Sequence, residues 1–136
     1  MKKLSFFLIT ITFFTFSCTK EEIVAQNSTS TLTGEWRWVS STGGIAGTTI
    51  TPETAGYERK LVLTNDMTYS RYKDNVLQNS GKFEITKEKS IYKTELVDFI
   101  KFDDGTKSVI QGNTSDELLL ADNFYDGFGE TFKRIK

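Results

Sequence analysis

Residues 32–39 read Leu-Thr-Gly-Glu-Trp-Arg-Trp-Val and begin the folded part of the chain. Trp36 and Trp38 are two positions apart, so an extended strand would place both indoles on one face. Large aromatic side chains that share a strand face are typical of a buried face. Gly34 precedes them and permits the backbone conformations that a tight turn into the strand requires. The segment therefore predicts a first strand whose tryptophans point into the core.

The opposite end of the chain offers a partner for this strand. Residues 130–135 read Glu-Thr-Phe-Lys-Arg-Ile and predict a last strand. The Arg134 guanidinium in that strand can stack on an indole ring, a contact worth about 0.5–2 kcal/mol. We therefore expect the first and last strands to meet and to close a barrel through Gly34, Trp36 and Arg134.

Between these ends, apolar and polar residues alternate with period two, and no sustained period of 3.6 residues is present. Turn signals separate the alternating segments, the clearest being Asp103-Asp104-Gly105. The expected strands are 57–64, 67–73, 76–86 with a bulge or bend at Ser80-Gly81, 91–94, 96–102, 107–111 and 117–121. Roughly eight or nine short strands joined by hairpins predict an all-β fold, a small up-and-down antiparallel β-barrel.

A long segment rich in glycine and threonine, residues 41–56, comes after the first strand and contains the only proline. Within it, Thr51-Pro52-Glu53 predicts one helical turn, with Thr51 as its cap and Pro52 in its first position. A long loop in a small domain is usually a lid, a binding loop or a mobile connection. This segment is the one obvious candidate for a lid, and the three alternatives stay open.

The first 17 residues have the order of a secretory signal peptide. Lys2 and Lys3 are followed by the apolar run from Leu4 to Phe16. This run is shorter than the ~20 residues that a membrane-spanning helix needs. The sequence therefore predicts that residues 1–17 are removed and that the protein is exported.

Residues 15–18, Thr-Phe-Ser-Cys, resemble the lipobox of bacterial lipoproteins, in which a small residue precedes an acylated cysteine. The resemblance implies lipid attachment at Cys18, whereas the alternative is an ordinary thiol. Residues 18–31 are polar and aperiodic, which predicts a flexible tether. Lys20-Glu21-Glu22 resembles a signal that sends some lipoproteins to the outer face of the outer membrane, although a solvated tether explains it equally well. We expect a lipid-anchored outer-membrane protein of the cell envelope, and its exposure on the outer surface stays open.

Composition narrows the classes of function. Removing 17 residues from 136 leaves 119, which suits one domain over residues 32–136. Loss of Lys2 and Lys3 changes the formal net charge from −1 to −3, which argues against nucleic acid as a partner. Histidine, the commonest general base, is missing, and Cys18 is the single cysteine. The sequence predicts a monomer that is not an enzyme and that uses neither a cofactor nor a metal.

The Gly34-Glu35-Trp36 motif, the long segment after it and Arg134 in the last strand together resemble the lipocalin-like domain of small bacterial lipoproteins, a calycin-type β-barrel. The resemblance spans residues 32–136. It implies that Gly34 and Trp36 open the barrel, that Arg134 packs on the tryptophan, and that the first loop arches over the mouth. The middle motif of that family and the helix that comes after the barrel in its larger members are absent.

Aromatic residues make up 13% of the chain and suggest where a ligand would bind. We expect Trp38, Tyr57, Tyr69 and Phe83 to line a cavity beneath the 43–56 loop, because aromatic rings suit an apolar pocket. The alternative is that they fill the core. The expected function is binding of a small hydrophobic ligand, and the alternative is a filled barrel that serves as an interaction or scaffold module. A cavity of about 300 Å³ or more would favour the ligand carrier.

Overall fold

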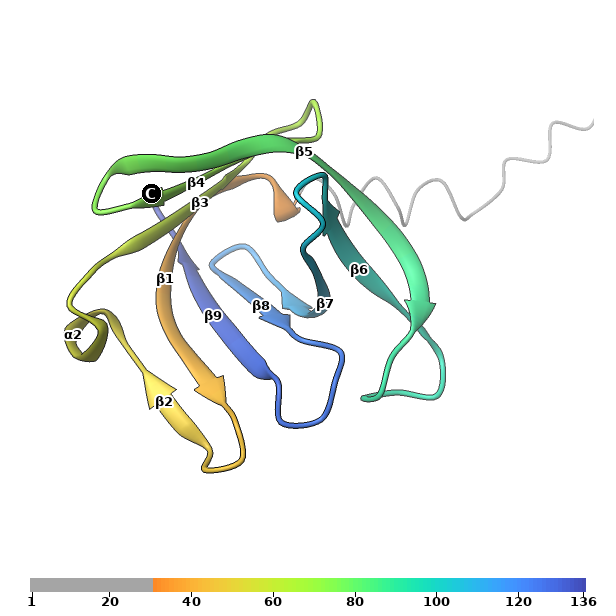
Figure 1. Cartoon of the computed structure of the whole chain (residues 1–136). Coiled ribbons are helices and arrows are strands. Elements are labelled where there is room, and N and C mark those ends of the chain that lie inside the picture. The colour runs from red at the N-terminus through yellow and green to blue at the C-terminus, as the bar shows by residue number, and fades with distance from the viewer. Residues whose placement is uncertain (1–30) are drawn as a thin grey trace, which may run out of the picture.

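The computed structural model describes residues 31–136 and shows an antiparallel sheet that closes on itself (Figure 1). Its elements are β1 (Gly34–Gly43), β2 (Thr48–Ile50), α2 (Pro52–Ala55), β3 (Arg59–Leu63), β4 (Thr68–Lys73), β5 (Val76–Lys89), β6 (Leu96–Phe102), β7 (Lys107–Asn113), β8 (Glu117–Ala121) and β9 (Phe128–Arg134). The described sheet has nine strands in the order β2-β1-β3-β4-β5-β6-β7-β8-β9, and β9 pairs again with β1. Eight of them close the barrel and β2 is an additional strand, so the predicted all-β barrel is confirmed.

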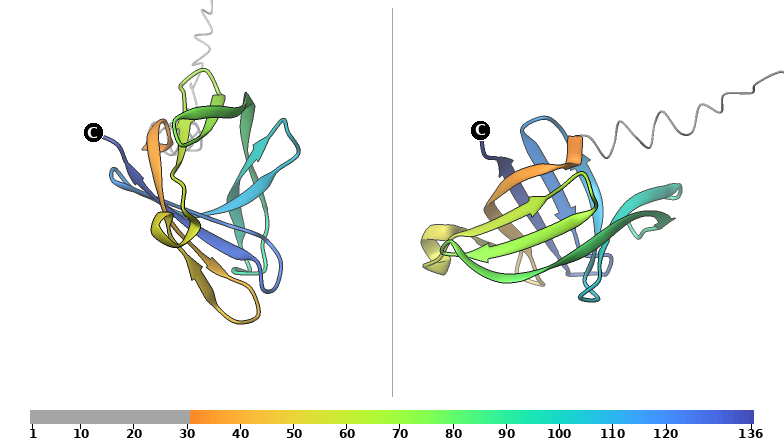
Figure 2. Two further views of the ribbon diagram at one scale, coloured as in Figure 1. Left: turned by 60° about the vertical axis from the view of Figure 1, so that its left-hand side comes forward. Right: turned by 90° about the horizontal axis from the view of Figure 1, so that it is seen from above.

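Strand β1 joins the two ends of the sheet. It pairs with β9 from Trp36 opposite Arg134 to Gly43 opposite Phe128. On its other side, β1 pairs first with β3 at residues 34–37 and then with β2 at its far end. A register shift between Trp38 and Ser40 bends the strand between these two partners. The barrel therefore closes on β1, and the β1–β2 hairpin extends beyond the closed wall, together with α2 (Figure 2).

The predicted contact between Arg134 and the first strand is present. The Arg134 guanidinium carbon lies 4.0 Å from the Trp36 ring centroid. Its Nη1 donates a hydrogen bond of 2.7 Å to the Thr33 carbonyl oxygen. Gly34 has a φ of +144°, and a Cβ at this position would lie 2.0 Å from Arg134 Nη1. Glycine is therefore required here both by the backbone conformation and by the close approach of the arginine.

Strand β5 changes partners along its length. Residues 76–82 pair with β4, and residues 83–89 pair with β6. Gly81 lies at this change, and a Cβ there would be 2.2 Å from the Asp103 carboxylate. That carboxylate accepts a hydrogen bond of 2.8 Å from the Lys82 backbone N–H. The strand continues through Ser80-Gly81, and the register shift in β5 lies nearby at Gln78, which has no partner because Arg71 pairs with Asn79 and Tyr72 with Leu77.

Segment 41–56 is more regular than a long loop. Strand β1 extends to Gly43, and β2 and α2 occupy much of the remainder of the segment. The predicted helical turn is present, because the Thr51 side chain accepts a hydrogen bond from the Thr54 N–H and proline lies in the first turn. Gly56 ends the turn in the left-handed region, with φ of 73°.

The predicted strand at 91–94 is wrong. These residues form a loop that is attached to the loop between β8 and β9. The Ile91 N–H donates a hydrogen bond of 2.9 Å to Asn123 Oδ1, and Tyr92 Oη donates one of 2.6 Å to the Asp122 carbonyl oxygen. Ile and Tyr favour strands, but here the polar groups are bonded to a neighbouring loop, which overrides that preference.

Core residues from neighbouring strands meet where β1 begins. Leu63 of β3 lies opposite Gly34 of β1, and Tyr69 of β4 lies opposite Leu63. These three residues are therefore neighbours across three adjacent strands of the barrel. Trp36 is fully buried, and its Nε1 donates a hydrogen bond of 2.8 Å to the Leu32 carbonyl oxygen. The core cluster comprises Leu32, Trp36, Trp38, Leu61, Leu63, Tyr69, Phe83, Ile100, Phe102, Leu118, Leu120 and Phe132.

The predicted signal peptide, the predicted lipid attachment at Cys18 and the tether as far as residue 30 lie outside the described residues. Across residues 31–136, no helix has both the length and the apolar character to cross a membrane.

Candidate functional site

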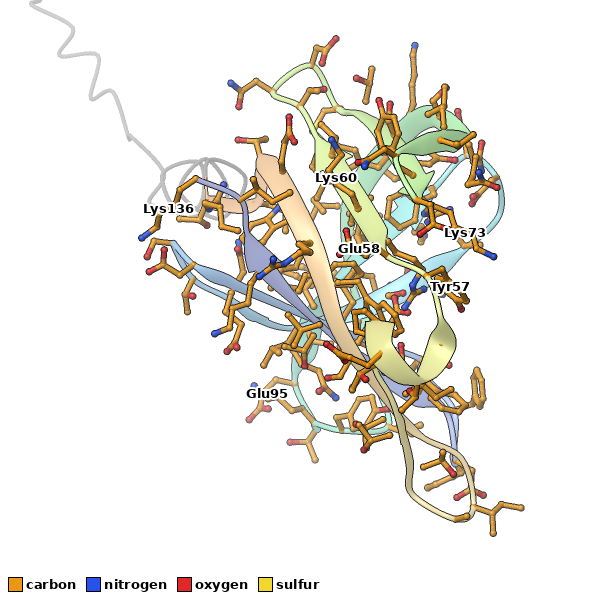
Figure 3. The ribbon with its side chains drawn as sticks, turned by 90° about the vertical axis from the view of Figure 1, so that its left-hand side faces the viewer. Tyr57, Glu58, Lys60, Lys73, Glu95 and Lys136 are labelled. Atoms are coloured by element: carbon orange, nitrogen blue, oxygen red, sulfur yellow. The ribbon has the colours of Figure 1, made fainter. Side chains whose placement is uncertain are left out.

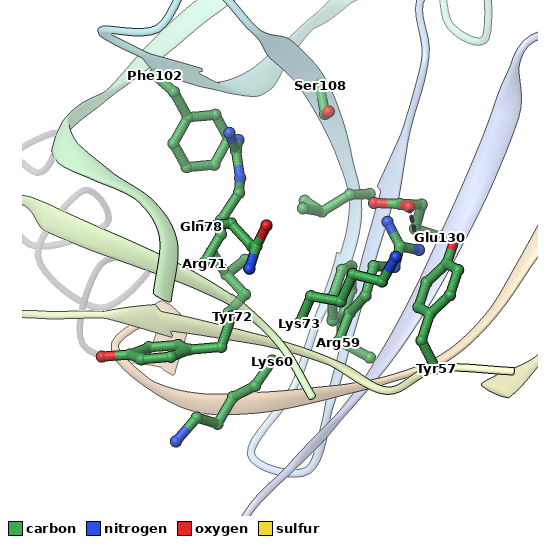
Figure 4. Close-up of a pocket in the computed structure, with 13 residues that line it drawn as sticks. Tyr57, Arg59, Lys60, Arg71, Tyr72, Lys73, Gln78, Phe102, Ser108 and Glu130 are labelled. Atoms are coloured by element: carbon green, nitrogen blue, oxygen red, sulfur yellow. Dashed lines mark hydrogen bonds and ion pairs between the residues drawn. The ribbon is translucent and has the colours of Figure 1, made fainter. Parts of the chain in front are cut away.

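A cavity of about 280 Å³ lies inside the barrel and is partly open to solvent (Figure 4). This volume is just below the range of about 300–1,000 Å³ that is common for ligand pockets. Tyr57 and Lys73 lie together at its rim, beside α2 (Figure 3). The lining residues are Tyr57, Arg59, Lys60, Leu61, Arg71, Tyr72, Lys73, Gln78, Phe102, Ser108, Leu120, Glu130 and Phe132.

The apolar part of the cavity wall belongs to the barrel core. Leu61, Phe102, Leu120 and Phe132 come from four different strands, and all four are buried members of the core cluster. Strand alternation explains why β3 provides both Leu61 and the polar Arg59 to the cavity, because residues two apart share a face. The cavity is therefore bounded by well-packed apolar side chains on one part of its surface.

Arg59 is the centre of the polar part. Its Nη2 donates hydrogen bonds of 2.6 Å to Glu130 Oε1 and 3.1 Å to Ser41 Oγ. The guanidinium carbon lies 4.0 Å from the Trp38 ring centroid. Trp38 Nε1 donates a hydrogen bond of 3.0 Å to the same Ser41 Oγ. An ion pair, a hydroxyl group and an indole ring thus hold the guanidinium in one place.

Part of Arg59 has no partner. Within residues 31–136, its Nε is buried without a hydrogen-bond acceptor, and Nη1 makes no hydrogen bond. Buried polar groups are nearly always hydrogen-bonded in folded proteins. A cavity-lining residue that keeps a buried donor free marks a place where an acceptor group can bind.

Lys73, the last residue of β4, carries the cavity's uncompensated charge. Its Nζ lies 4.1 Å from the Tyr57 ring centroid but forms no hydrogen bond or ion pair with any described residue. Tyr57 in turn stacks on Trp38 with a centroid separation of 6.0 Å. Lys73 is exposed at the rim, so its ammonium group is accessible to a molecule that enters from solvent.

Arg71 borders the cavity on a different side and is already neutralised. Its guanidinium carbon lies 4.1 Å from the Phe102 ring centroid, and it forms an ion pair with Asp104. Burial alone would raise the pKa of Asp104, but hydrogen bonds from Thr106 and the charge of Arg71 outweigh it and lower the pKa to about 2. This pair connects the turn between β6 and β7 to β4, so its main role is structural.

The structure brings together only part of the predicted ligand site. Tyr57 lines the cavity, and Trp38 lies behind it, 1% exposed and in contact with Arg59. Tyr69 and Phe83 are buried core residues and do not line the cavity. Strand alternation predicts correctly that these side chains point inward, but it does not say at which depth along the barrel they lie.

The charged residues of the cavity were missed in the sequence. Arg59 lies two positions before Leu61 and four before Leu63, whose side chains are both buried. An arginine in phase with buried leucines is a readable signal for an inward-facing cation. The same alternation places Lys73 in phase with buried Tyr69 and Glu130 in phase with buried Phe132. The sequence does not show that these two residues lie near Arg59, because that depends on the pairing of β3 with β4 and on the ion pair from β9.

Segment 41–56 does not act as a lid in this structure. None of the described residues 41–56 lines the cavity, and Tyr57 is the first residue of this region to do so. Ile50 and Ala55 instead pack against the core cluster. The segment therefore covers part of the barrel wall and positions Tyr57 at the rim.

The described residues contain no group of three or more His, Cys, Asp or Glu side chains that could hold a metal ion. Comparison of the chain with known protein families, with characterised proteins and with solved structures found no match. The closed eight-stranded barrel is compatible with a calycin-like fold. The class defined by fold and site is thus a small antiparallel β-barrel with a partly charged internal cavity.

Proposed function

We propose that this protein is a non-catalytic, lipocalin-like binding protein that holds a small molecule in the barrel cavity. The observation that carries the proposal is a cavity of about 280 Å³ that combines an apolar wall with free hydrogen-bond donors. Small-molecule sites commonly have this composition, in which apolar contacts give affinity and a few polar groups fix orientation.

The polar inventory of the cavity supports binding rather than catalysis. Among the described residues that line the cavity, Glu130 is the only carboxylate, and it is ion-paired with Arg59, which leaves no free base there. The whole chain also lacks histidine, the residue most often used for proton transfer near neutral pH.

Filling the cavity tests this proposal. Ser108 lines it from β7, whereas Gln111 on the same strand is exposed. Native mass spectrometry of the purified full-length protein is expected to detect a bound small molecule in the wild type and in Gln111→Leu, but not in Ser108→Leu. Retention of the same bound mass in Ser108→Leu, or its absence from all three proteins, would contradict binding in the cavity.

We also propose that the protein is exported and anchored to the outer membrane through acylated Cys18. The support is the order of charged, apolar and small residues before the cysteine. Two or more acyl chains give stable anchoring, at about 0.8 kcal/mol per buried methylene. Cys18→Ser is expected to move the protein from the membrane fraction to the soluble fraction, and Ser30→Ala is the matched control. Continued membrane retention of Cys18→Ser would refute acylation.

A second candidate function is an interaction module that works through its loops. Three loops present exposed apolar side chains, namely Ile45, Tyr92, Phe124 and Tyr125, of which Ile45 is 93% and Tyr125 is 83% exposed. These loops are joined by the hydrogen bond from Tyr92 Oη to the Asp122 carbonyl oxygen and by one of 3.1 Å from the Gly44 N–H to the Asp126 carbonyl oxygen. Exposed apolar clusters often mark contact surfaces.

The two candidates predict opposite mutational patterns in cells. If the loops carry the function, Phe124→Ser combined with Tyr125→Ser should abolish it, while Ser108→Leu should have little effect. A ligand-binding protein should show the reverse. The measurement is the envelope phenotype of a deletion strain complemented with each variant at equal protein level.

A further inference from the structure

We infer that the ligand of this cavity is a small amphipathic anion, whose acidic group binds Lys73 and Arg59 and whose apolar part contacts the barrel core. This inference rests on the proposed binding function and specifies the chemical class of the ligand.

The charges around the cavity are unbalanced. Of the residues in the described range 31–136, four cations line it, and three of these have acidic partners. Arg59 pairs with Glu130, Lys60 with Glu35 and Arg71 with Asp104. Lys73 has no acidic partner among the described residues. An anion at the rim would therefore complete the pairing, with an attraction that is stronger than in bulk water because the cavity wall excludes part of the solvent.

Arg59 adds directional donors next to this charge. Its Nε and Nη1 are free within the described region, while Nη2 is bound to Glu130 and Ser41. Guanidinium groups bind carboxylates and phosphates through charge-assisted hydrogen bonds. Because Trp38, Ser41 and Glu130 already hold the side chain, a ligand does not need to immobilise it.

The Glu130 carboxylate limits where the acidic group can lie. An anion close to Glu130 would be repelled, so it must bind on the side of Arg59 that faces Lys73. Figure 4 shows Lys73, Arg59 and Tyr57 gathered at one side of the cavity, with Glu130 beside Arg59. Lys73 Nζ is also close to the Tyr57 ring, which keeps the ammonium group near this position.

The apolar wall determines the rest of the ligand. Leu61, Phe102, Leu120 and Phe132 are buried and offer no hydrogen-bonding side-chain groups. The volume of about 280 Å³ favours a short chain or a single ring over a long lipid tail. The ligand class is therefore a carboxylate, phosphate monoester or sulfonate attached to a short apolar group.

Titrations with matched eight-carbon probes test the inference. Octanoate and octyl phosphate carry an acidic group, whereas octanamide has the same chain without charge. Binding to the full-length protein is followed by ligand-observed NMR at neutral pH and below micelle-forming concentrations. Both anions are expected to bind at least tenfold more tightly than octanamide, and their affinity should fall as salt is raised.

Variants assign the effect to the two residues. Lys73→Met is expected to weaken binding of both anions about fivefold, the size of effect for an exposed charge, and to leave octanamide unchanged. Lys73→Arg should restore anion binding. Lys93→Met removes an exposed lysine from the loop after β5 and serves as the matched control. Arg59→Lys keeps the charge beside Glu130 but removes the Nε donor, and should weaken anion binding about tenfold.

Two outcomes would overturn the inference in different ways. Equal affinity for octanoate and octanamide, with no effect of Lys73→Met, would show that the site binds neutral apolar molecules; ligand binding itself would stand. Failure of all three probes to bind, together with no bound mass in the native spectrum, would overturn the proposed function as well.

Discussion

At the scale of single residues, Arg134 reinforces the closure of the barrel. Its guanidinium covers the Trp36 ring and donates hydrogen bonds to backbone carbonyl groups of Thr31, Thr33 and Ser115. These contacts connect the start of β1, the end of β9 and the turn before β8. One side chain thus ties together three segments that are far apart in the sequence.

Arg134→Ala should therefore lower the free energy of unfolding by about 1–3 kcal/mol, because it removes a cation–π contact and charged hydrogen bonds. The neighbouring Lys133 is exposed and pairs with Glu117 at the surface. Lys133→Ala should cost less than about 1 kcal/mol. Urea unfolding monitored by tryptophan fluorescence measures both. Equal midpoints for the two variants would show that the Arg134 contacts do not stabilise the fold.

A substitution at Gly34 tests the same contact with Arg134. Gly34→Ala should destabilise the protein by about 1–3 kcal/mol, because alanine is strained at this φ and its Cβ would collide with Arg134 Nη1. In the Arg134→Ala background the collision is removed and only the backbone strain remains, so the cost of Gly34→Ala should be smaller. A double-mutant cycle measures this coupling. Additive costs would mean that the arginine is not the obstacle.

At the scale of elements, the turn between β6 and β7 is fixed to the neighbouring hairpin. Asp104 Oδ2 forms an ion pair with Arg71 of β4 and accepts a hydrogen bond of 2.8 Å from Asn79 Nδ2 of β5. Its Oδ1 accepts a hydrogen bond of 2.9 Å from the Thr106 N–H. The turn thus fixes the part of β5 where the strand stops pairing with β4 and begins to pair with β6.

This turn should make stability depend on acidity. The pKa of Asp104 falls from an ordinary value of 3.8 to about 2 in the folded chain, so the folded state disfavours the proton. The resulting stability is complete above about pH 4 and is lost as the pH falls toward 2. Asp104→Asn should cost about 1–2 kcal/mol at pH 7, and this difference should largely disappear at pH 2.

Urea unfolding between pH 2 and 7 measures the difference. Asp98→Asn is the control, because Asp98 pairs with Lys87 on the exposed surface. A difference between wild type and Asp104→Asn that stays constant across this range would show that protonation of Asp104 is not linked to folding.

At the scale of the whole molecule, the two ends of the described chain lie side by side. The Ile135 N–H donates a hydrogen bond of 2.8 Å to the Glu35 carbonyl oxygen, and β1 and β9 are paired. A barrel with adjacent ends can be opened elsewhere if the ends are joined. The place of the opening should decide whether the barrel folds.

We expect a circular permutant that joins residue 136 to residue 31 and opens between Lys93 and Thr94 to keep the fold, because both residues are exposed in a loop. A permutant opened between Gly81 and Lys82 should fail to fold, because this position lies within β5, where the strand changes from pairing with β4 to pairing with β6. Circular dichroism and urea unfolding compare the two proteins. A stable permutant opened at Gly81 would show that continuity of β5 at this position is not required for the barrel to fold.

The amount that could be predicted differs between the fold and the site. Period-two alternation and the turn residues predict the barrel, and the Thr51 cap predicts the one short helical turn described after β2. These signals are local, because each depends on residues a few positions apart. The extension of β1 to Gly43 and the loop at 91–94 were missed, because hydrogen-bond partners distant in sequence decide them.

The chain alone determined which side chains face inward and which residues could meet at the closure, because strand alternation and glycine geometry are properties of the local backbone. Only the tertiary structure decided that Tyr69 and Phe83 fill the core while Arg59, Lys73 and Glu130 surround the cavity. Depth along a barrel depends on the stagger between neighbouring strands, and that stagger is set by contacts between segments far apart in the sequence.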